Sequence, residues 1–434
     1  MAIDLNWEQV VTWLVLLFVL FALISDKIRF DGAALGGLLL LGLIGIAPAS
    51  TLFSGFSSPI LFTVAIVLAM SAGFVESGIL TGFGQSIAKR IKKPRRQMAA
   101  LMLFTTIIGG FVNNVGTVGI MLPTAQRMAR RAGIPKANAG MWLVYITILG
   151  GSFTLIGTAS NIIVSTFRAQ VLGEPFKMFD FAAHGLAMVA VAFLIMFFCE
   201  ACGLKFAKPS NSKGEDDEEG KDEYKDESSV GNLASPKEAL QRETPQPEPA
   251  PARNRRKTVI LLLSLLPALI LISLGLIHPA VGFGIIVFIW LITGVFSVKT
   301  AYKNISIPII LFLGSMLSIA NILSSIGALE VITNPILPLV SSLPPFLLIL
   351  SVLIVTAAIS NFVDNSVSAV LMSPLVLQLY ITGAVAVSAD ALLMAVAAGA
   401  SLGIVIPTHQ ATLVVMNSTG FSKMSFMRTG AVML

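Results

Sequence analysis

Long apolar runs recur along this chain, and they constrain its fold more than any other feature. Each run is about 17 to 22 residues long, the length that an α-helix needs to cross the hydrocarbon core of a bilayer. A membrane β-barrel would instead show alternating segments of about 10 residues. Because 55% of the residues are hydrophobic and only 12% are charged, the sequence predicts an all-α polytopic membrane protein.

Two short amide-rich stretches interrupt these apolar runs about 250 residues apart. They are residues 111–117 (Phe-Val-Asn-Asn-Val-Gly-Thr) and residues 362–368 (Phe-Val-Asp-Asn-Ser-Val-Ser), and each is followed by a proline, Pro123 or Pro374. Amide groups at membrane depth are costly unless they line a water-filled or ligand-filled site. We therefore expect the two stretches to be the two halves of one binding site, built by an internal repeat.

Each amide-rich stretch is expected to form the tip of a re-entrant helical hairpin. The first hairpin, about residues 98–131, has basic residues on both flanks, and a single crossing cannot place both ends on the same side of a membrane. The alternative is two full crossings joined at Gly109-Gly110. The second hairpin, about residues 344–380, has flanks without Lys or Arg, so it is expected to enter from the opposite side.

A discontinuous helix is expected after each hairpin. The first covers about residues 138–171 and is interrupted between Gly150 and Asn161, and the second covers about residues 391–416 and is interrupted between Gly403 and Gln410. Glycines and hydroxyl residues in mid-span indicate a broken helix, whose free carbonyl groups and helix ends bind ions in transporters. A small-residue packing face is the alternative interpretation.

These patterns divide the chain into two inverted membrane repeats, residues 1–204 and 258–434. Residues 205–257 between them are rich in Lys, Glu, Asp, Ser and Pro, a composition that predicts a disordered linker. Lys27 and Arg29 follow the first apolar run, so the positive-inside rule places the N-terminus outside and the linker in the cytoplasm. After Arg428 few apolar residues remain, and the final helix of the second repeat is expected to be missing.

At the tips and breaks the sequence resembles the divalent-anion/sodium symporter family, the citrate-transporter-like permeases of the ion-transporter superfamily. That family carries Ser-Asn-Thr at each tip, where this chain has Asn113-Asn114-Val115 and Asp364-Asn365-Ser366. The break from Gly150 to Asn161 is very similar to the family's form, and residues 406–410 resemble a variant of bacterial permeases. The resemblance implies a homodimer in a prokaryotic inner membrane, with a sodium site between each tip and its break and the anion between the tips.

Sodium is a hard cation and prefers oxygen ligands. The expected sodium ligands are Asn113, Asn114, Thr154, Gly157, Thr158 and Asn161 in the first half, and Asp364, Asn365, Thr408 and Gln410 in the second. The expected anion-binding residues are Asn114, Thr117, Asn365, Ser366 and Ser368. Lys and Arg are not expected inside the membrane segments, so bound sodium and helix dipoles would supply the positive potential.

The function predicted from these features is secondary active transport, with sodium-coupled symport of a di- or tricarboxylate or a sulfate-like oxyanion. The alternative is a sodium/proton antiporter in which Asp364, and also His409, carries protons; both side chains could instead have structural roles, Asp364 as a helix cap. The sequence contains no P-loop, metal-ligand cluster or nucleophile–base motif, so we expect neither an enzyme nor a cofactor other than sodium. The chain has more basic than acidic residues, which in a membrane protein indicates orientation rather than nucleic-acid binding. The expected partners are therefore lipid, sodium and the anion.

Overall fold

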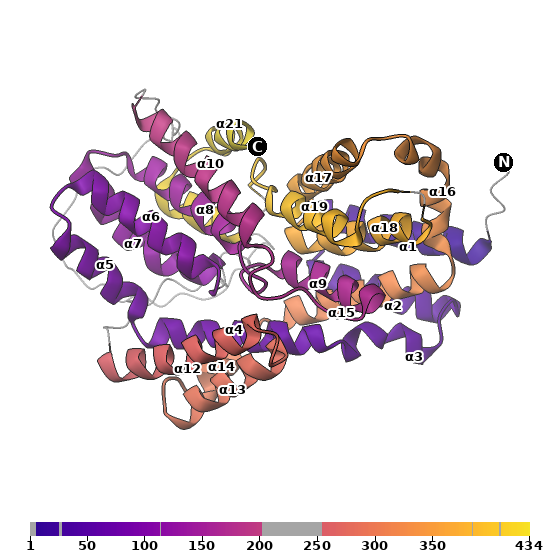
Figure 1. The fold of residues 1–434 in the computed structure, drawn as a ribbon, viewed down its shortest axis with the longest axis horizontal. Helices are drawn as coiled ribbons and strands as arrows, with labels where there is room; N and C mark the ends of the chain where they lie inside the picture. Colours follow the sequence, from indigo (N-terminus) through magenta and orange to yellow (C-terminus); the bar gives the residue numbers. More distant parts are fainter. Residues whose placement is uncertain (1–5, 26–27, 113, 202–253, 384, 408) are drawn as a thin grey trace, which may run out of the picture.

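The computed structural model describes residues 6–25, 28–112, 114–201, 254–383, 385–407 and 409–434, and its elements are helices (Figure 1). Within these residues, four helices are long and apolar enough to cross a membrane by themselves, namely Pro59–Glu76, Arg255–Ser273, Ile307–Ser325 and Pro345–Phe362. Seven further apolar helices are shorter. The chain is therefore an all-helical protein with several membrane-spanning helices.

The first half consists of ten α-helices and one 3₁₀ turn in the part that the structure describes. They are α1 (Trp7–Ser25), α2 (Phe30–Ile44), α3 (Ala49–Leu52), η1 (Ser54–Ser57), α4 (Pro59–Glu76), α5 (Ile79–Arg90), α6 (Pro94–Gly109), α7 (Asn114–Ala132), α8 (Lys136–Gly151), α9 (Ala159–Leu172) and α10 (Ala182–Ala201). The amide-rich tip lies between α6 and α7, and the predicted break lies between α8 and α9.

The second half presents α-helices in the same order. They are α12 (Arg255–Ser273), α13 (Pro279–Ile292), α14 (Val298–Asn304), α15 (Ile307–Ser325), α16 (Ala328–Ser341), α17 (Pro345–Phe362), α18 (Asn365–Ile381), α19 (Ala389–Ser401), α20 (Gln410–Thr419) and α21 (Lys423–Met433). The pair α17 and α18 thus corresponds to α6 and α7, and the pair α19 and α20 corresponds to α8 and α9.

Two of the apolar runs of the sequence, at residues 59–80 and 307–329, do not form single helices. Gly78 and Gly327 adopt left-handed φ values of 64° and 66°, and the separate helices α5 and α16 start after them. Helix α12 begins inside the predicted linker, where Asn254 accepts a hydrogen bond from the backbone N–H of Lys257. The remaining linker residues, 205–253, lie outside the described part.

The last described element is the short helix α21, with 11 residues against the 20 of α10 at the matching position of the first half, so the absence of a full-length final helix stays a prediction. Phe426 of helix α21 is buried. The carbonyl oxygen of Phe426 accepts a hydrogen bond of 2.8 Å from the hydroxyl of Tyr145 on α8. The rings of Tyr145 and Phe426 also stack with centroids 4.9 Å apart. Few apolar residues therefore suffice here, because α21 packs on helices that are already buried.

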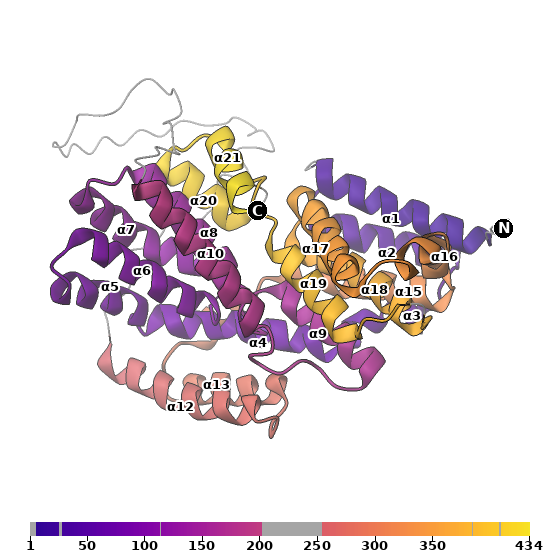
Figure 2. The ribbon, with the colours of Figure 1, turned by 45° about the horizontal axis from the view of Figure 1, so that its top comes forward.

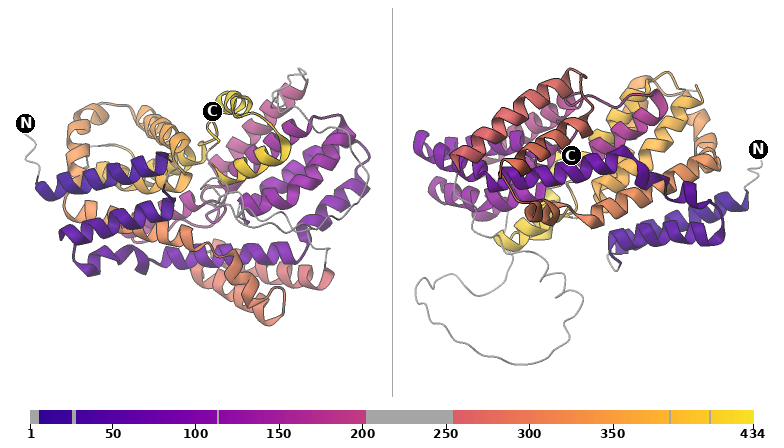
Figure 3. Two further views of the ribbon diagram at one scale, coloured as in Figure 1. Left: turned by 180° about the vertical axis from the view of Figure 1, so that it is seen from behind. Right: turned by 90° about the horizontal axis from the view of Figure 1, so that it is seen from below.

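The two halves of the chain exchange helices rather than forming separate bodies (Figures 1 and 2). Helix α4 packs against α13 and α14 of the second half, and α15 packs against α2 and η1 of the first. The second parts of the broken helices also cross over, because α9 packs against α18 and α19 while α20 packs against α7 and α8. Seen from behind, the C-terminal helices lie against the helices of the first half (Figure 3).

Candidate functional site

The first tip and the first break lie against one another. Helix α6 ends at Gly109 and α8 ends at Gly151, and the Thr154 hydroxyl in the break donates a hydrogen bond to the Gly110 carbonyl of the tip. An added Cβ on Gly150 would lie 2.9 Å from Thr106 Cα, so the glycine allows the two backbones to approach closely. The sequence placed these stretches in one site, and the structure brings them into contact.

Asn161, in the first turn of α9, fixes the conformation of this break. Its Nδ2 donates to the carbonyl oxygens of Ser152 at 2.9 Å and Thr154 at 2.8 Å, while the backbone N–H of Gly157 donates to Thr154 Oγ1 at 3.0 Å. Asn161 is fully buried, and its Oδ1 accepts no hydrogen bond from the described residues. The Asn161 amide therefore orders the break and leaves one oxygen available.

Several oxygen atoms gather where the tip meets the break. A Cβ on Gly151 would lie 2.9 Å from the carbonyl oxygen of Gly157 and 3.2 Å from Asn114 Oδ1, and a Cβ on Gly157 would lie 2.2 Å from the carbonyl oxygen of Gly151. Asn114 is buried, and within the described chain its Oδ1 has no hydrogen-bond partner; the same is true of Thr117 Oγ1. Buried oxygen atoms without donors are costly, and a bound cation would satisfy them.

The second tip and break form a matching arrangement with different side chains. Ser360 Oγ lies 2.6 Å from the carbonyl oxygen of Ala400 and 3.1 Å from Asn365 Oδ1. Gly403 lies beside them, because an added Cβ there would be 2.4 Å from Ser360 Oγ and 2.9 Å from Asn365 Oδ1. Asn365 begins α18 as Asn114 begins α7, and Gly403 faces Asn365 as Gly151 faces Asn114.

Asn361, near the end of α17, orders the second break. Its Oδ1 accepts hydrogen bonds from the backbone N–H groups of Val405 at 2.8 Å and Ile406 at 3.3 Å, and its Nδ2 donates to the Leu402 carbonyl at 3.4 Å. The first break is held by an asparagine of the broken helix, Asn161, whereas the second is held by an asparagine of the hairpin. The two halves thus reach similar backbone arrangements with non-equivalent residues.

Thr412 occupies in α20 the position that Asn161 occupies in α9, because each is the third residue of its helix. Its side chain is buried, and among the described residues its Oγ1 has no hydrogen-bond partner. Helix α20 packs against α7, which carries Asn114 and Thr117. In the described part of the chain, buried oxygen atoms without hydrogen-bond partners therefore occur near the starts of α7, α9 and α20.

The remaining predicted residues occupy several environments. Asp364 is exposed and caps α18, since its Oδ1 accepts from the backbone N–H of Ser366 at 2.9 Å, and the Ser368 hydroxyl donates to the Asp364 carbonyl at 3.3 Å. Thr158 Oγ1 lies 3.1 Å from Ser160 Oγ. His409 caps α20, because its Nδ1 accepts from the backbone N–H of Ala411 at 3.2 Å.

Three predicted ligands cannot be placed in detail. Asn113 and Thr408 lie outside the described residues, and Gln410 begins α20 with a side chain that also lies outside them. The sequence analysis in turn missed Ser360, Asn361 and Thr412, and it placed Gly151 and Gly403 in the breaks without assigning them to a site. A signal existed for the first two, because Ser360-Asn361 is a polar pair within an apolar helix, close to the tip.

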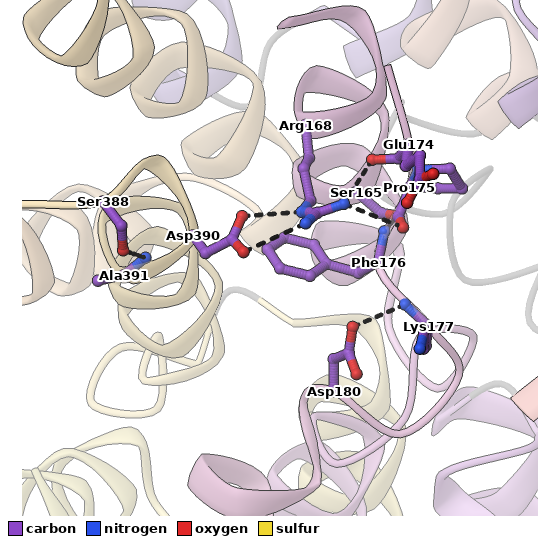
Figure 4. Close-up of polar contacts among 10 residues, drawn as sticks. All are labelled: Ser165, Arg168, Glu174, Pro175, Phe176, Lys177, Asp180, Ser388, Asp390 and Ala391. Carbon is purple, nitrogen blue, oxygen red and sulfur yellow. Dashed lines mark hydrogen bonds and ion pairs between the residues drawn. The ribbon is translucent and has the colours of Figure 1, made fainter. Parts of the chain in front are cut away.

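The expectation that the membrane segments contain no Lys or Arg is wrong for Arg168 on α9 (Figure 4). Its Nε donates to Asp390 Oδ1 at 2.8 Å, its Nη2 donates to Asp390 Oδ2 at 3.2 Å, and its Nη1 donates to the Glu174 carbonyl at 2.7 Å. The guanidinium also lies over the Phe176 ring, 4.8 Å from its centroid. All of these partners lie near the C-terminal end of α9, so the charge is neutralised away from the break.

A cavity of about 330 Å³ adjoins the first break. Its lining includes Leu155 of the break and the first residues of α4 and α13, and it combines apolar and polar side chains. The polar lining includes Ser57, Ser58, Thr63, Thr166, Gln170 and Asn321.

Comparison with known proteins gives three findings. The family model described as citrate transporter matches residues 18–399. The uncharacterized transporter YfbS of Escherichia coli (strain K12) is 30% identical over 121 residues, which is 28% of this chain and only 19% of that relative. The crystal structure of the Alcanivorax borkumensis YdaH transporter, described as having an unusual topology, matches 99% of this chain and 96% of that chain with a TM-score of 0.53 and 14% identity. This last similarity concerns the fold alone.

Proposed function

Because the chain belongs to the citrate transporter family, a family of membrane transporters rather than enzymes, we propose that it is a sodium-coupled symporter of a small carboxylate anion. The observation that carries the sodium assignment is the group of oxygen atoms between the first tip and the first break. Asn114 Oδ1 and the carbonyl oxygens of Gly151 and Gly157 meet there around positions that only glycine can occupy. A hard monovalent cation suits such a set of neutral oxygen ligands.

The second proposed sodium site lies at the matching position of the second half. Asn365 Oδ1 and the Ser360 hydroxyl would bind the cation beside Gly403, and Thr412 is close in sequence to Thr408 and Gln410, which are proposed ligands as well. Of the other proposed ligands, Asn113, Thr154, Thr158 and Asn161 belong to the first site and Asp364 to the second. Two sodium ions would offset two charges of a carboxylate substrate.

The proposed anion site lies between the two tips. Helices α7 and α18 begin there with Asn114 and Asn365, and the N-terminal N–H groups of a helix favour negative charge. The Thr117 hydroxyl, buried without a partner among the described residues, is available as a donor to a carboxylate. Ser366 and Ser368 would serve the same role on the second tip.

Alternating access is proposed to follow from two inverted repeats with re-entrant hairpins. The matching order of helices in the two halves supports this arrangement, as does the exchange of α9 and α20 between them. In the proposed orientation, with the N-terminus outside and the linker in the cytoplasm of a prokaryotic cell, the first residues of α4 and α13 face outward. The cavity beside the first break would then be the outer access route, and a homodimer is the proposed assembly.

Uptake by reconstituted protein tests this function. Proteoliposomes loaded without sodium should accumulate labelled citrate or another di- or tricarboxylate only when sodium is supplied outside, whereas potassium should not replace it. Uptake that is unaffected by removing sodium would refute the coupling. The antiporter alternative, which draws on the exposed carboxylate of Asp364 at the second tip, predicts that a sodium gradient moves protons in vesicles without any organic anion. A pH-sensitive dye inside empty vesicles separates the two mechanisms.

A further inference from the structure

Each broken helix rests with its unwound backbone against a glycine of the helix that follows it in the chain. In the first half this glycine is Gly185 on α10, where an added Cβ would lie 2.4 Å from Phe153 Cα and 2.6 Å from the Phe153 backbone nitrogen. In the second half it is Gly430 on α21, where an added Cβ would lie 2.3 Å from the Ile404 carbonyl oxygen and 2.8 Å from Val405 Cα. Only glycine leaves room for such backbone contacts, since a Cβ atom does not approach other atoms this closely in a packed interior.

Phe153 and Val405 each reach the hairpin on their other side. The Phe153 ring packs edge to face on Phe111 of the first tip, with centroids 6.3 Å apart, and an added Cβ on Gly110 would lie 2.5 Å from the Phe153 ring. In the second half, the backbone N–H of Val405 donates a hydrogen bond of 2.8 Å to Asn361 Oδ1 on α17. The position of each break relative to its hairpin therefore depends on the glycine behind the break.

These two glycine contacts differ from ordinary helix packing in what lies opposite the glycine. Gly399 on α19 also fits tightly, because its added Cβ would lie 2.6 Å from the Leu353 carbonyl oxygen, but Leu353 lies inside α17, where helical hydrogen bonds orient the backbone. Phe153 and Ile404 instead lie between two helices, so tertiary contacts must orient their backbone groups. The glycine contacts thus act on the part of each break that its own helices do not fix.

The two supporting helices lie beside each other (Figures 1 and 2). Helix α10 packs against both α21 and α8, and α21 is joined to α8 through the hydrogen bond between the Tyr145 hydroxyl and the Phe426 carbonyl. One group of packed helices therefore backs both breaks.

We propose that Gly185 and Gly430 are positioning residues for the two sodium sites. Each glycine holds the unwound backbone of its break so that the oxygen atoms there, such as the Gly151 and Gly157 carbonyls in the first half, stay directed toward the cation. This inference rests on the proposed function, because the sodium sites are what requires the breaks to be fixed. It gives the short helix α21 the same supporting role as α10.

Alanine variants of the two glycines test the proposal, since each variant should disturb its own break and leave the other unchanged. Hydrogen exchange of the full chain in detergent, without sodium, is measured by mass spectrometry. In Gly185→Ala, exchange of residues 152–158 should become faster by about tenfold, whereas exchange of residues 403–407 should stay within about twofold of the wild-type rate. Gly430→Ala should show the reverse.

Both breaks contain backbone N–H groups whose exchange reports on their conformation. In the first break, the N–H of Leu155 donates to the Met178 carbonyl at 2.9 Å. In the second break, the N–H of Val405 is the donor to Asn361 described above. Displacement of a break lengthens these hydrogen bonds, so its amides exchange faster.

A second measurement concerns sodium itself. The sodium concentration for half-maximal uptake should rise about tenfold in either variant, because ligands displaced by about 0.5 Å or more no longer fit the cation, whereas uptake at saturating sodium should fall less. Sodium binding can also be followed without transport, through the rise in unfolding temperature that a bound ligand causes. This rise should be smaller in both variants than in the wild-type protein.

Two glycines away from the breaks serve as controls. Gly36→Ala on α2 adds a methyl group at a position where no described atom lies within 4 Å, so it should change neither measurement. Gly73→Ala on α4 would place its Cβ 2.3 Å from the Trp290 ring. It should lower the unfolding temperature and leave both the exchange of the breaks and the sodium dependence unchanged, which separates a general loss of packing from displacement of a break.

Three results would overturn the proposal: equal acceleration of exchange at both breaks in one variant, unchanged exchange at that variant's own break, or a normal sodium dependence in a variant whose own break exchanges faster. If sodium neither stabilises the wild-type protein nor is needed for its uptake, the proposed function fails, and the exchange measurements by themselves still decide whether the glycines fix the breaks. If an alanine variant does not fold, the wild-type protein provides the test. Sodium should then slow exchange in residues 182–188 of α10 and 427–433 of α21 together with the breaks, and exchange in these helices that does not respond to bound sodium would overturn the proposal.

Discussion

Arg168 on α9 and Asp390 on α19 form a bidentate ion pair, with N–O distances of 2.8 and 3.2 Å (Figure 4). This pair joins a broken helix of the first half to a broken helix of the second half. Arg168 is 19% exposed and Asp390 is 46% exposed, so solvent screens the pair in part. The arginine also binds the Glu174 and Pro175 carbonyl oxygens, which makes it the more strongly held partner.

Removing Arg168 should therefore destabilise the protein more than removing Asp390. We expect Arg168→Ala to lower the free energy of unfolding by about 2 kcal/mol and Asp390→Asn by about 1 kcal/mol or less. Arg168→Lys should not restore stability, because an ammonium group cannot form the paired contacts of a guanidinium. Thermal unfolding in detergent measures the three variants, and equal effects of Arg168→Ala and Asp390→Asn would contradict this account.

A methyl group at Gly151 should abolish sodium-dependent transport. In Gly151→Ala the new Cβ would lie within 3.2 Å of Asn114 Oδ1 and the Gly157 carbonyl oxygen, so it occupies the space proposed for the cation. Gly119→Ala is the matched control on the same hairpin, because nothing lies within 4 Å of a Cβ there and alanine favours a helix. Uptake assays on both variants, with protein amounts equalised, test the prediction; normal uptake by Gly151→Ala would exclude the proposed site.

Thr412→Val should weaken sodium dependence with little effect on stability. The substitution keeps the side-chain shape but removes a buried hydroxyl that has no partner among the described residues, so the folded protein without sodium loses no hydrogen bond. The sodium concentration for half-maximal uptake should rise about tenfold, which is the effect expected when the cation loses one oxygen ligand. Thr105→Val is the control, since that buried hydroxyl already donates to the Leu101 carbonyl of its own helix. An unchanged sodium dependence in Thr412→Val would remove Thr412 from the site.

The variant Asp364→Asn tests whether the carboxylate of Asp364 at the second tip binds sodium, carries protons or only caps α18. Asparagine is also a good helix cap, so the contact with the backbone N–H of Ser366 should persist and stability should change by less than about 0.5 kcal/mol. Asp364→Ala should cost about 1 kcal/mol through loss of the cap. We expect Asp364→Asn to lower sodium affinity, whereas a proton carrier would lose its proton coupling. If the sodium dependence and the pH profile of uptake both stay unchanged, Asp364 is only a cap.

Deletion of residues 212–250 should leave transport within a few-fold of the wild-type rate. The composition of this segment, rich in charged residues and proline, provides too little apolar surface to pack against a membrane domain. Uptake and membrane insertion should be measured on the same preparation. Complete loss of uptake with normal insertion would show that the linker has a role in transport.

Sequence periodicity predicted the positions of the main helices and of both tips. The hairpin arms, expected at about residues 98–131 and 344–380, correspond to α6 with α7 and to α17 with α18. Such predictions succeed because apolar length and helix-breaking residues act locally. The same reasoning missed α5 and α16, which begin after the left-handed glycines Gly78 and Gly327, because a glycine near the end of an apolar run does not show by itself that the helix ends there.

The sequence by itself determined that this chain is a helical membrane protein with two matched amide-rich tips and a charged segment between its halves. Only the tertiary structure decided which residues order the breaks, because Asn161 and Asn361 do so from non-equivalent positions. It also decided that Arg168 pairs with Asp390, more than 200 residues away. Local pattern fixes where a helix starts and stops, whereas a hydrogen bond or an ion pair between distant segments depends on how whole helices pack, and in this fold α9 and α20 each pack into the opposite half.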